Sequence, residues 1–225
     1  MKRGLLAGVL AAAVAVFVWL AAAYVDGGSV VSFDVRTAEW VAREMPGWAE
    51  WAARPFTWVG GWAGLTAVGL LAALLLRLVP RRLHDVSFLL LTGVGVGVLT
   101  AVLKSVFERA RPDEGSAIPL PHSYSFPSGH ASGSVALLGG IAVLVAERLP
   151  ERRDRVAVLG VAAALSACIA ASRVILNVHY VSDVIAGYAL GVAWLSLCLL
   201  VRAEVDRRSA RFRHEAVTPP THDPG

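Results

Sequence analysis

The chain has 225 residues, of which 56% are hydrophobic and only 17% are charged. Soluble domains carry about a quarter charged residues, and a soluble core of this size has no room for apolar blocks of about twenty residues. The composition therefore excludes a soluble enzyme, a disordered chain and a disulfide scaffold. It indicates an integral membrane protein.

Six apolar blocks are long enough to cross about 30 Å of hydrocarbon as helices. They cover residues Leu5–Val25, Trp58–Val79, Val86–Lys104, His130–Ala146, Val156–Ser172 and Asp183–Val201. Helices satisfy their own backbone groups in lipid, and the alternating pattern of a barrel strand is absent. The sequence predicts an all-α, polytopic membrane protein in which residues 1–201 form one bundle of six transmembrane helices.

The first block has a second interpretation. Met1-Lys2-Arg3, the apolar run and Ala21-Ala22-Ala23 resemble a cleavable secretory signal. The run of about twenty residues is longer than the core of a usual signal, which favours a retained helix. Cleavage would leave five spans in the same orientation.

Basic residues are distributed unevenly between alternate loops. Of the 21 Lys and Arg residues, 14 fall on the side that holds both termini and 7 on the other side. Because cytoplasmic loops carry the excess of basic residues, we expect both termini in the cytoplasm and the protein in the cytoplasmic membrane. The net charge of +4 then reflects topology and requires no nucleic-acid surface.

Two polar segments flank or interrupt these spans. Residues 26–55 contain three Trp residues among charges, and indole rings prefer the lipid headgroup layer. We expect short amphipathic helices there, on the outer (periplasmic) surface, broken at Pro46-Gly47 and serving as a membrane anchor. Residues 202–225 are polar, basic and Pro-rich at the end, which predicts a disordered cytoplasmic tail.

Polar and ionisable residues cluster at the outer ends of spans three to six. Such groups are costly at membrane depth unless they are paired, solvated or used. They are Lys104, Arg111-Pro112, Pro127-Ser128-Gly129-His130, Ser172-Arg173, His179 and Asp183. Topology alone requires these segments to share one face of the membrane, the extracytoplasmic one.

The charges of this cluster suit a phosphate group. Lys104, Arg111 and Arg173 supply three positive charges and Asp183 one negative charge, so the formal sum of +2 complements a phosphate monoester dianion. A guanidinium bonds two phosphate oxygens at once, and an ammonium adds a point charge.

The start of the fourth span is also suited to an anion. Gly129 allows backbone N–H groups to approach closely at a helix N-terminus, where the dipole favours negative charge. The hydroxyl of Ser128 either donates to the phosphate or caps the helix, and both roles stay open.

The two histidines suggest the reaction. His179 and Asp183 are four residues apart, so the carboxylate can bond one ring nitrogen and leave the other free to attack phosphorus. His130 can protonate the departing alcohol and later activate water. A His-x-x-x-Asp pair is more often structural or part of a metal site when taken alone. The neighbouring Lys and Arg residues repel a divalent ion, so we expect neither metal nor cofactor.

Three separated blocks resemble the signature of the type 2 phosphatidic acid phosphatase superfamily. They are Lys104-x6-Arg111-Pro112, Pro127-Ser128-Gly129-His130 and Ser172-Arg173-x5-His179-x3-Asp183, complete and contained within residues 104–183. The resemblance implies a metal-independent phosphatase in which His179 forms a phosphohistidine, Asp183 orients it and His130 acts as general acid and base. It also implies phosphate binding by Lys104, Arg111, Ser128, Gly129 and Arg173.

Two further residues in this range occupy no signature position. His122 is a loop histidine to which no role is given. Arg109 is an extra cation near the pocket that could help with a second phosphate.

The position of the cluster at headgroup level leads to a functional hypothesis. We expect a lipid phosphatase that acts on phosphatidic acid, phosphatidylglycerol phosphate or a polyprenyl diphosphate at the outer membrane face. Phosphotransfer to an alcohol acceptor and non-catalytic phospholipid binding or transport are the alternatives. The oligomeric state stays open.

Overall fold

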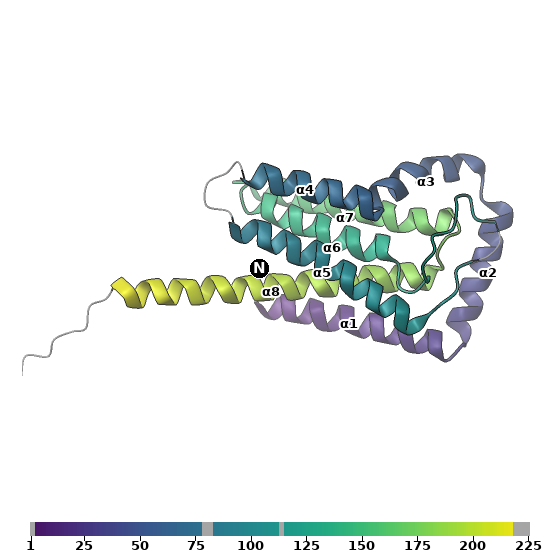
Figure 1. The fold of residues 1–225 in the computed structure, drawn as a ribbon, viewed down its shortest axis with the longest axis horizontal. Helices are drawn as coiled ribbons and strands as arrows, with labels where there is room; N and C mark the ends of the chain where they lie inside the picture. The colour runs from purple at the N-terminus through teal and green to yellow at the C-terminus, as the bar shows by residue number, and fades with distance from the viewer. Residues whose placement is uncertain (1–2, 78–82, 113–114, 218–225) are drawn as a thin grey trace, which may run out of the picture.

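The structure, a computed structural model, describes residues 3–77, 83–112 and 115–217. Within these ranges it contains helices and no strand (Figure 1). The helices are α1 (Arg3–Val25), α2 (Ser29–Glu44), α3 (Gly47–Gly60), α4 (Trp62–Arg77), α5 (Leu83–Phe107), α6 (Gly129–Ala146), α7 (Arg152–Ile175) and α8 (Val181–Val217). The predicted all-α class is confirmed.

Five of these helices, α1, α5, α6, α7 and α8, are long and apolar enough to cross a membrane. Helices α3 and α4 meet that criterion only as a pair, with a bend of 54° between them, so the described chain contains five candidate spans, or six if this bent pair counts as one. The bend lies at Gly60-Gly61, where two consecutive glycines weaken the helix. A Cβ at Gly60 would collide with Ile169, so glycine also permits the close packing of α3 on α7. The second predicted span thus contains a bend that periodicity did not indicate, and its last residues lie outside the described part of the chain.

Helix α6 lies at the centre of the bundle. It contacts α3, α4, α5, α7 and α8, whereas α1 packs mainly along α8. The buried face of α6 is rich in small residues, among them Ala131, Ser134, Ala136 and Gly140, which let neighbouring helices approach closely. Large apolar side chains are instead exposed on the outside of the bundle, as lipid contact requires.

One short helix, α2, crosses one end of the bundle, and α3 leads from it back to α4 (Figure 1). The chain breaks between α2 and α3 at Met45-Pro46, beside the predicted Pro46-Gly47 position. Trp48, Trp51, Trp58 and Trp62 expose their indole rings, while Asp34 and Val41 of α2 are buried. We call this end, which also carries residues 108–112 and 115–128, the loop end, and the opposite end, where α5 begins and α6 finishes, the tail end.

Helix α8 extends beyond the bundle at the tail end (Figure 1). The sequence predicts disorder after Val201, whereas the structure continues the helix to Val217. Charge pairs at helical spacing support this extension, because Glu204 bonds Arg207 and Arg208 on the next turn and Arg3 of α1. Residues 218–225 lie outside the described chain.

Candidate active site

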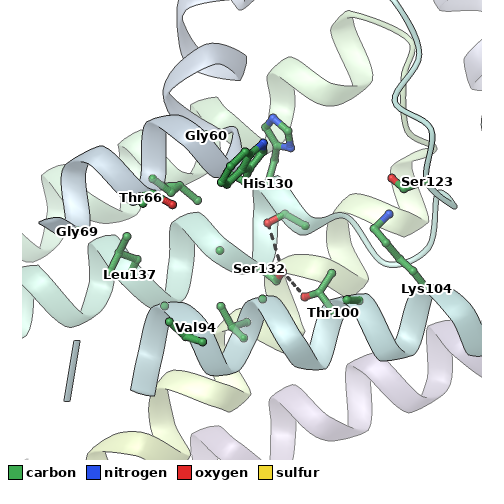
Figure 2. Close-up of a pocket in the computed structure, with 18 of the residues that line it drawn as sticks. Gly60, Thr66, Gly69, Val94, Thr100, Lys104, Ser123, His130, Ser132 and Leu137 are labelled. Carbon is green, nitrogen blue, oxygen red and sulfur yellow. Dashed lines mark hydrogen bonds between the residues drawn. The ribbon is translucent and has the colours of Figure 1, made fainter. Parts of the chain in front are cut away.

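A cavity of about 540 Å³ lies among α4, α5 and α6 and reaches the loop end. Six of the eight predicted site residues line it: Lys104, Arg111, Gly129, His130, Arg173 and His179. Figure 2 shows His130 and Lys104 toward one end of the cavity and Gly69, Val94 and Leu137 toward the other. The cavity therefore has a cationic end and an apolar end.

The third signature block is held against the second by α8. The backbone N–H of Ser128 donates to the carbonyl of Asp183 at 2.9 Å, next to the start of α6. Gly187, one turn further along α8, permits this approach, because a Cβ there would collide with the Ser128 carbonyl. The fold thus brings segments that are far apart in the sequence to one end of the cavity.

Contacts of the His179 ring define its tautomer. The Arg111 Nη1 atom lies 3.0 Å from Nε2 of His179, and a guanidinium has donors only. Nε2 is therefore the unprotonated nitrogen, and Nδ1 carries the hydrogen. Nδ1 lies 3.3 Å from Oδ2 of Asp183 and 3.2 Å from Oγ of Ser125. The lone pair of Nε2 faces the guanidinium of Arg111.

The surroundings of His179 keep the imidazole neutral. Burial holds the pKa of His179 well below 6.5, and the nearby charges of Arg111, Lys104 and Arg173 lower that pKa further. An unprotonated Nε2 at neutral pH is the state that a nucleophile needs.

Asp183 is completely buried behind His179. Its Oδ2 accepts hydrogen bonds from Ser125 Oγ at 2.5 Å and from the Tyr180 N–H at 3.0 Å. Its Oδ1 accepts from Arg109 Nη1 at 2.7 Å. These donors replace the water that a buried carboxylate loses, and they fix its orientation toward the imidazole.

His130 lies at the first turn of α6, beside the bend between α3 and α4. Its Nε2 donates to the carbonyl of Thr57 at 3.1 Å, which leaves Nδ1 for proton transfer. The Thr57 hydroxyl accepts a hydrogen bond from Arg173. Thr57 therefore holds both a candidate acid–base residue and a candidate phosphate ligand, a role that no sequence motif indicated.

Two buried donors at this end have no protein partner among the described residues, namely Ser128 Oγ and Arg173 Nε. Buried polar atoms are nearly always hydrogen-bonded, so these two donors beside the cavity are available to a bound ligand. Ser128 occupies the N-cap position of α6, yet its hydroxyl makes no capping bond. This favours phosphate contact over capping. A Cβ at Gly129 would make only an ordinary contact with Thr100 at 3.5 Å, so close packing does not require this glycine.

Lys104, on the last turn of α5, holds the loop that covers the site. Its ammonium donates to the carbonyls of Tyr124 and Ser125, the latter at 3.2 Å. Arg111 holds the same loop by donating from Nε to the Ser123 carbonyl at 2.8 Å. Both cations therefore line the cavity and hold in place the loop that covers it.

The structure corrects the expectation for Arg109. This side chain is buried and points away from the cavity lining, toward Asp34 at 2.8 Å and Asp183 at 2.7 Å. It is committed to these carboxylates and offers no cation to a second phosphate. The charge of Asp34 cancels that of Arg109, so the formal charge of the site stays +2. Asp34 carried one sequence signal, because it shares the buried face of amphipathic α2 with Val41.

Curated proteins with similar sequences are lipid phosphatases by name. The chain is 36% identical to phosphatidylglycerophosphatase B of Bacillus subtilis (strain 168) over 60% of its own length and 64% of the relative's. It is 33% identical to decaprenylphosphoryl-5-phosphoribose phosphatase of Mycobacterium tuberculosis over 58% and 66% of the two chains. It is 38% identical to lipid A 1-phosphatase of Rhizobium johnstonii over 49% and 45%. The match thus spans between 45% and 66% of the length of these relatives.

The fold is also known from a solved structure. A transmembrane PAP2 type phosphatidylglycerolphosphate phosphatase from Bacillus subtilis superposes with a TM-score of 0.78 at 26% sequence identity, over 88% of this chain and 96% of that one. The model of the PAP2 superfamily matches residues 85–207, more than half of the chain. This multi-pass membrane protein therefore belongs to the PAP2 superfamily.

Proposed function

We propose that this protein is a lipid phosphatase that hydrolyses a lipid phosphate monoester or diphosphate without a metal ion. One observation carries the proposal: the cationic site around His179 opens directly into an apolar cavity between membrane-spanning helices. A lipid with its phosphate among Lys104, Arg111 and Arg173 could place its chains along this cavity.

The cavity walls support a lipid substrate over a soluble one. Beyond the hydrogen bond between Thr100 and Ser132, at 2.9 Å, the lining is made mainly of Leu, Val, Ala and Gly residues from α4, α5 and α6 (Figure 2). Burying methylene groups there contributes about 0.8 kcal/mol each. A soluble phosphate ester would gain nothing from this part of the site.

The geometry supports a two-step phosphoryl transfer. In the first step, Nε2 of His179 attacks phosphorus, a P–N bond forms, the P–O bond to the lipid alcohol breaks, and His130, entering the step as the imidazolium, gives its Nδ1 proton to that alcohol and becomes neutral. In the second step His130 takes a proton from water, the water oxygen attacks phosphorus, and the P–N bond breaks to release phosphate. Asp183 stabilises the imidazole through Nδ1, while Arg111, Arg173 and Lys104 stabilise the charge on the transferred group.

The proposal places the loop end on the extracytoplasmic side of the cytoplasmic membrane. The excess of basic residues on the side of the termini supports this orientation. The exposed indole rings of α3 and α4 would then lie in the outer headgroup layer, at the depth of the site. The names of the relatives support lipid phosphates as a class, and we keep phosphatidic acid, phosphatidylglycerol phosphate and polyprenyl diphosphate as candidate substrates.

A phosphate-release assay tests the proposal. Purified protein in detergent micelles is given each of these three lipids with EDTA present, and free phosphate and alcohol-transfer products are measured. We expect phosphate release that persists with the chelator, is inhibited by vanadate and is lost in His179→Ala. Chelator-sensitive release would overturn the metal-free mechanism, a transfer product would indicate a phosphotransferase, and binding without turnover would indicate a lipid-binding protein.

A further inference from the structure

A chain of buried charges connects the surface helix α2 to the catalytic carboxylate. Arg109 Nη2 donates to Oδ2 of Asp34 at 2.8 Å, and Arg109 Nη1 donates to Oδ1 of Asp183 at 2.7 Å. Both aspartates are fully buried, and Arg109 is 4% exposed. One guanidinium therefore serves two carboxylates, one from α2 and one from α8.

The guanidinium has little freedom to move. It lies over the rings of Tyr24 and Tyr180, at 4.8 Å and 4.2 Å from their centroids. Cation–π contacts of this kind favour one position of a planar guanidinium. Arg109 thus joins Asp34 to Asp183 through a fixed fork.

Asp34 also holds the first turn of α8. Its Oδ1 accepts from the backbone N–H of Ser182 at 3.0 Å, and its Oδ2 accepts from the Ser182 hydroxyl at 2.5 Å. Ser182 immediately precedes Asp183. The same carboxylate on α2 therefore fixes both the backbone and the side-chain partner of Asp183.

Arg109 and His179 contact different oxygens of Asp183, and this arrangement links the buried charges to catalysis. Arg109 occupies Oδ1, and Oδ2 remains for the Nδ1 hydrogen of His179 at 3.3 Å. If the guanidinium moved, Oδ1 would lose its charged donor, Asp183 would be held through Oδ2 alone by Ser125 and Tyr180, and the imidazole would be oriented less firmly. Misplacing a reacting group by about 1 Å can cost 10²-fold in rate.

We propose that Asp34 and Arg109 form a positioning pair that sets the orientation of Asp183 and, through Asp183, the orientation of the nucleophile His179. Helix α2 thereby contributes to the active site. Neither residue occupies a defined position of the three signature blocks. The inference deepens the proposed function and rests on it. Both residues are positioning residues, since neither lines the cavity.

Three variants of the full-length protein test the pair: Asp34→Asn, Arg109→Lys and the double variant Asp34→Asn/Arg109→Lys. The asparagine removes one charge at nearly constant volume. The lysine keeps the charge and loses the fork, because a single ammonium cannot reproduce two parallel N–H donors. Glu39→Gln, an exposed acid on the same helix, and Asp85→Asn, a buried acid at the tail end, serve as matched controls.

The readouts are kcat and KM on short-chain phosphatidic acid, inhibition by inorganic phosphate, and the unfolding temperature in detergent. We expect kcat to fall by about 10- to 100-fold in each single variant, as for other residues that orient a reacting group. Phosphate inhibition should change less than about threefold, since Lys104, Arg111 and Arg173 are untouched. The double variant should lose no more than either single variant, because the two residues act as one unit.

Several results would overturn the proposal that Asp34 and Arg109 act as a positioning pair. Unchanged kcat in folded variants would do so, as would a loss of phosphate affinity equal to the loss of kcat, or additive losses in the double variant. If Asp34→Asn does not fold, Arg109→Lys carries the test, and failure of both to fold while Asp85→Asn folds would assign the pair to stability alone. A wild-type protein that releases no phosphate from any of the lipids would instead contradict the proposed function.

Discussion

Two clusters of Asp and Arg lie at opposite ends of this bundle, each with a buried Asp, and they use the same groups differently. At the loop end one arginine, Arg109, bonds two carboxylates, Asp34 and Asp183. At the tail end one carboxylate, Asp85, bonds two arginines, Arg148 at 2.7 Å and Arg202 at 3.1 Å.

What differs is the second oxygen of each carboxylate. Both oxygens of Asp85 bond arginines, so this cluster connects α5 to the segment that follows α6 and to α8. Asp183 gives one oxygen to Arg109 and turns the other toward the imidazole of His179, which lines the cavity. An ion cluster therefore connects helices at one end and, in the proposed mechanism, orients a nucleophile at the other.

The largest expected effect distinguishes the two carboxylates, Asp183 and Asp85, directly. Asp183→Asn should lower kcat by about 10³- to 10⁴-fold, because the amide no longer stabilises the imidazole in its attacking tautomer. Asp85→Asn should keep kcat within about threefold and lower the unfolding temperature by on the order of 5 °C, because a buried ion pair loses one charge. Phosphate release and thermal unfolding in detergent measure both effects. Equal kinetic losses in the two variants would remove the distinction.

The next effect concerns His130, which belongs to the loop end but lies outside its ion cluster. His130→Gln should lower kcat by about 10²- to 10⁴-fold, the usual contribution of a general acid and base. An activated ester with a good leaving group, such as a nitrophenyl phosphate, should recover part of the first step because it needs no proton. Equal losses on both substrates would contradict the role of His130 as an acid.

The cations of the loop end should also affect the pH dependence of kcat/KM. Burial and the charges of Arg111, Lys104 and Arg173 hold the pKa of His179 below 6.5, and only the unprotonated ring can attack. Activity should therefore persist below pH 6.5 and be lost as pH falls through the lowered pKa of His179. Lys104→Gln removes one of these charges and should move this acid limb upward, by up to about one pH unit.

Titration of the substrate phosphate must be separated from this effect. The limb assigned to His179 should stay at the same pH for substrates whose phosphate pKa values differ. A limb that follows the substrate pKa, and that does not move in Lys104→Gln, would contradict the assignment.

The smallest effect concerns the apolar end of the cavity. Gly97 lines it and has open space around its Cα, so Gly97→Leu should fill volume that a lipid chain would occupy. We expect KM for long-chain lipids to rise about fourfold or more, the equivalent of one displaced methylene group at about 0.8 kcal/mol, and KM for a short-chain phosphate to stay unchanged. Gly160→Leu on α7, also in open space, is the matched control. Equal effects on both chain lengths would argue against a chain in this cavity.

The sequence predicted the spans because apolar length is a local signal. It predicted His179, His130 and the three cations because the membrane topology places their segments on one face. Asp34, Ser125 and Thr57 were missed because their roles depend on contacts between distant segments, such as Thr57 with His130 across the α3–α4 bend. Arg109 was recognised as a cation, but only the fold shows that Asp34 and Asp183 use its charge.

The central claim is that the imidazole at the loop end receives the phosphoryl group. A brief reaction with lipid labelled in its terminal phosphate, quenched in alkali, should yield labelled protein whose label is stable in base, is released by acid and maps to His179. The same label should be present in Asp85→Asn and absent from His179→Ala. Rapid phosphate release by the wild type with no label at His179, or with label that persists in His179→Ala, would contradict this account.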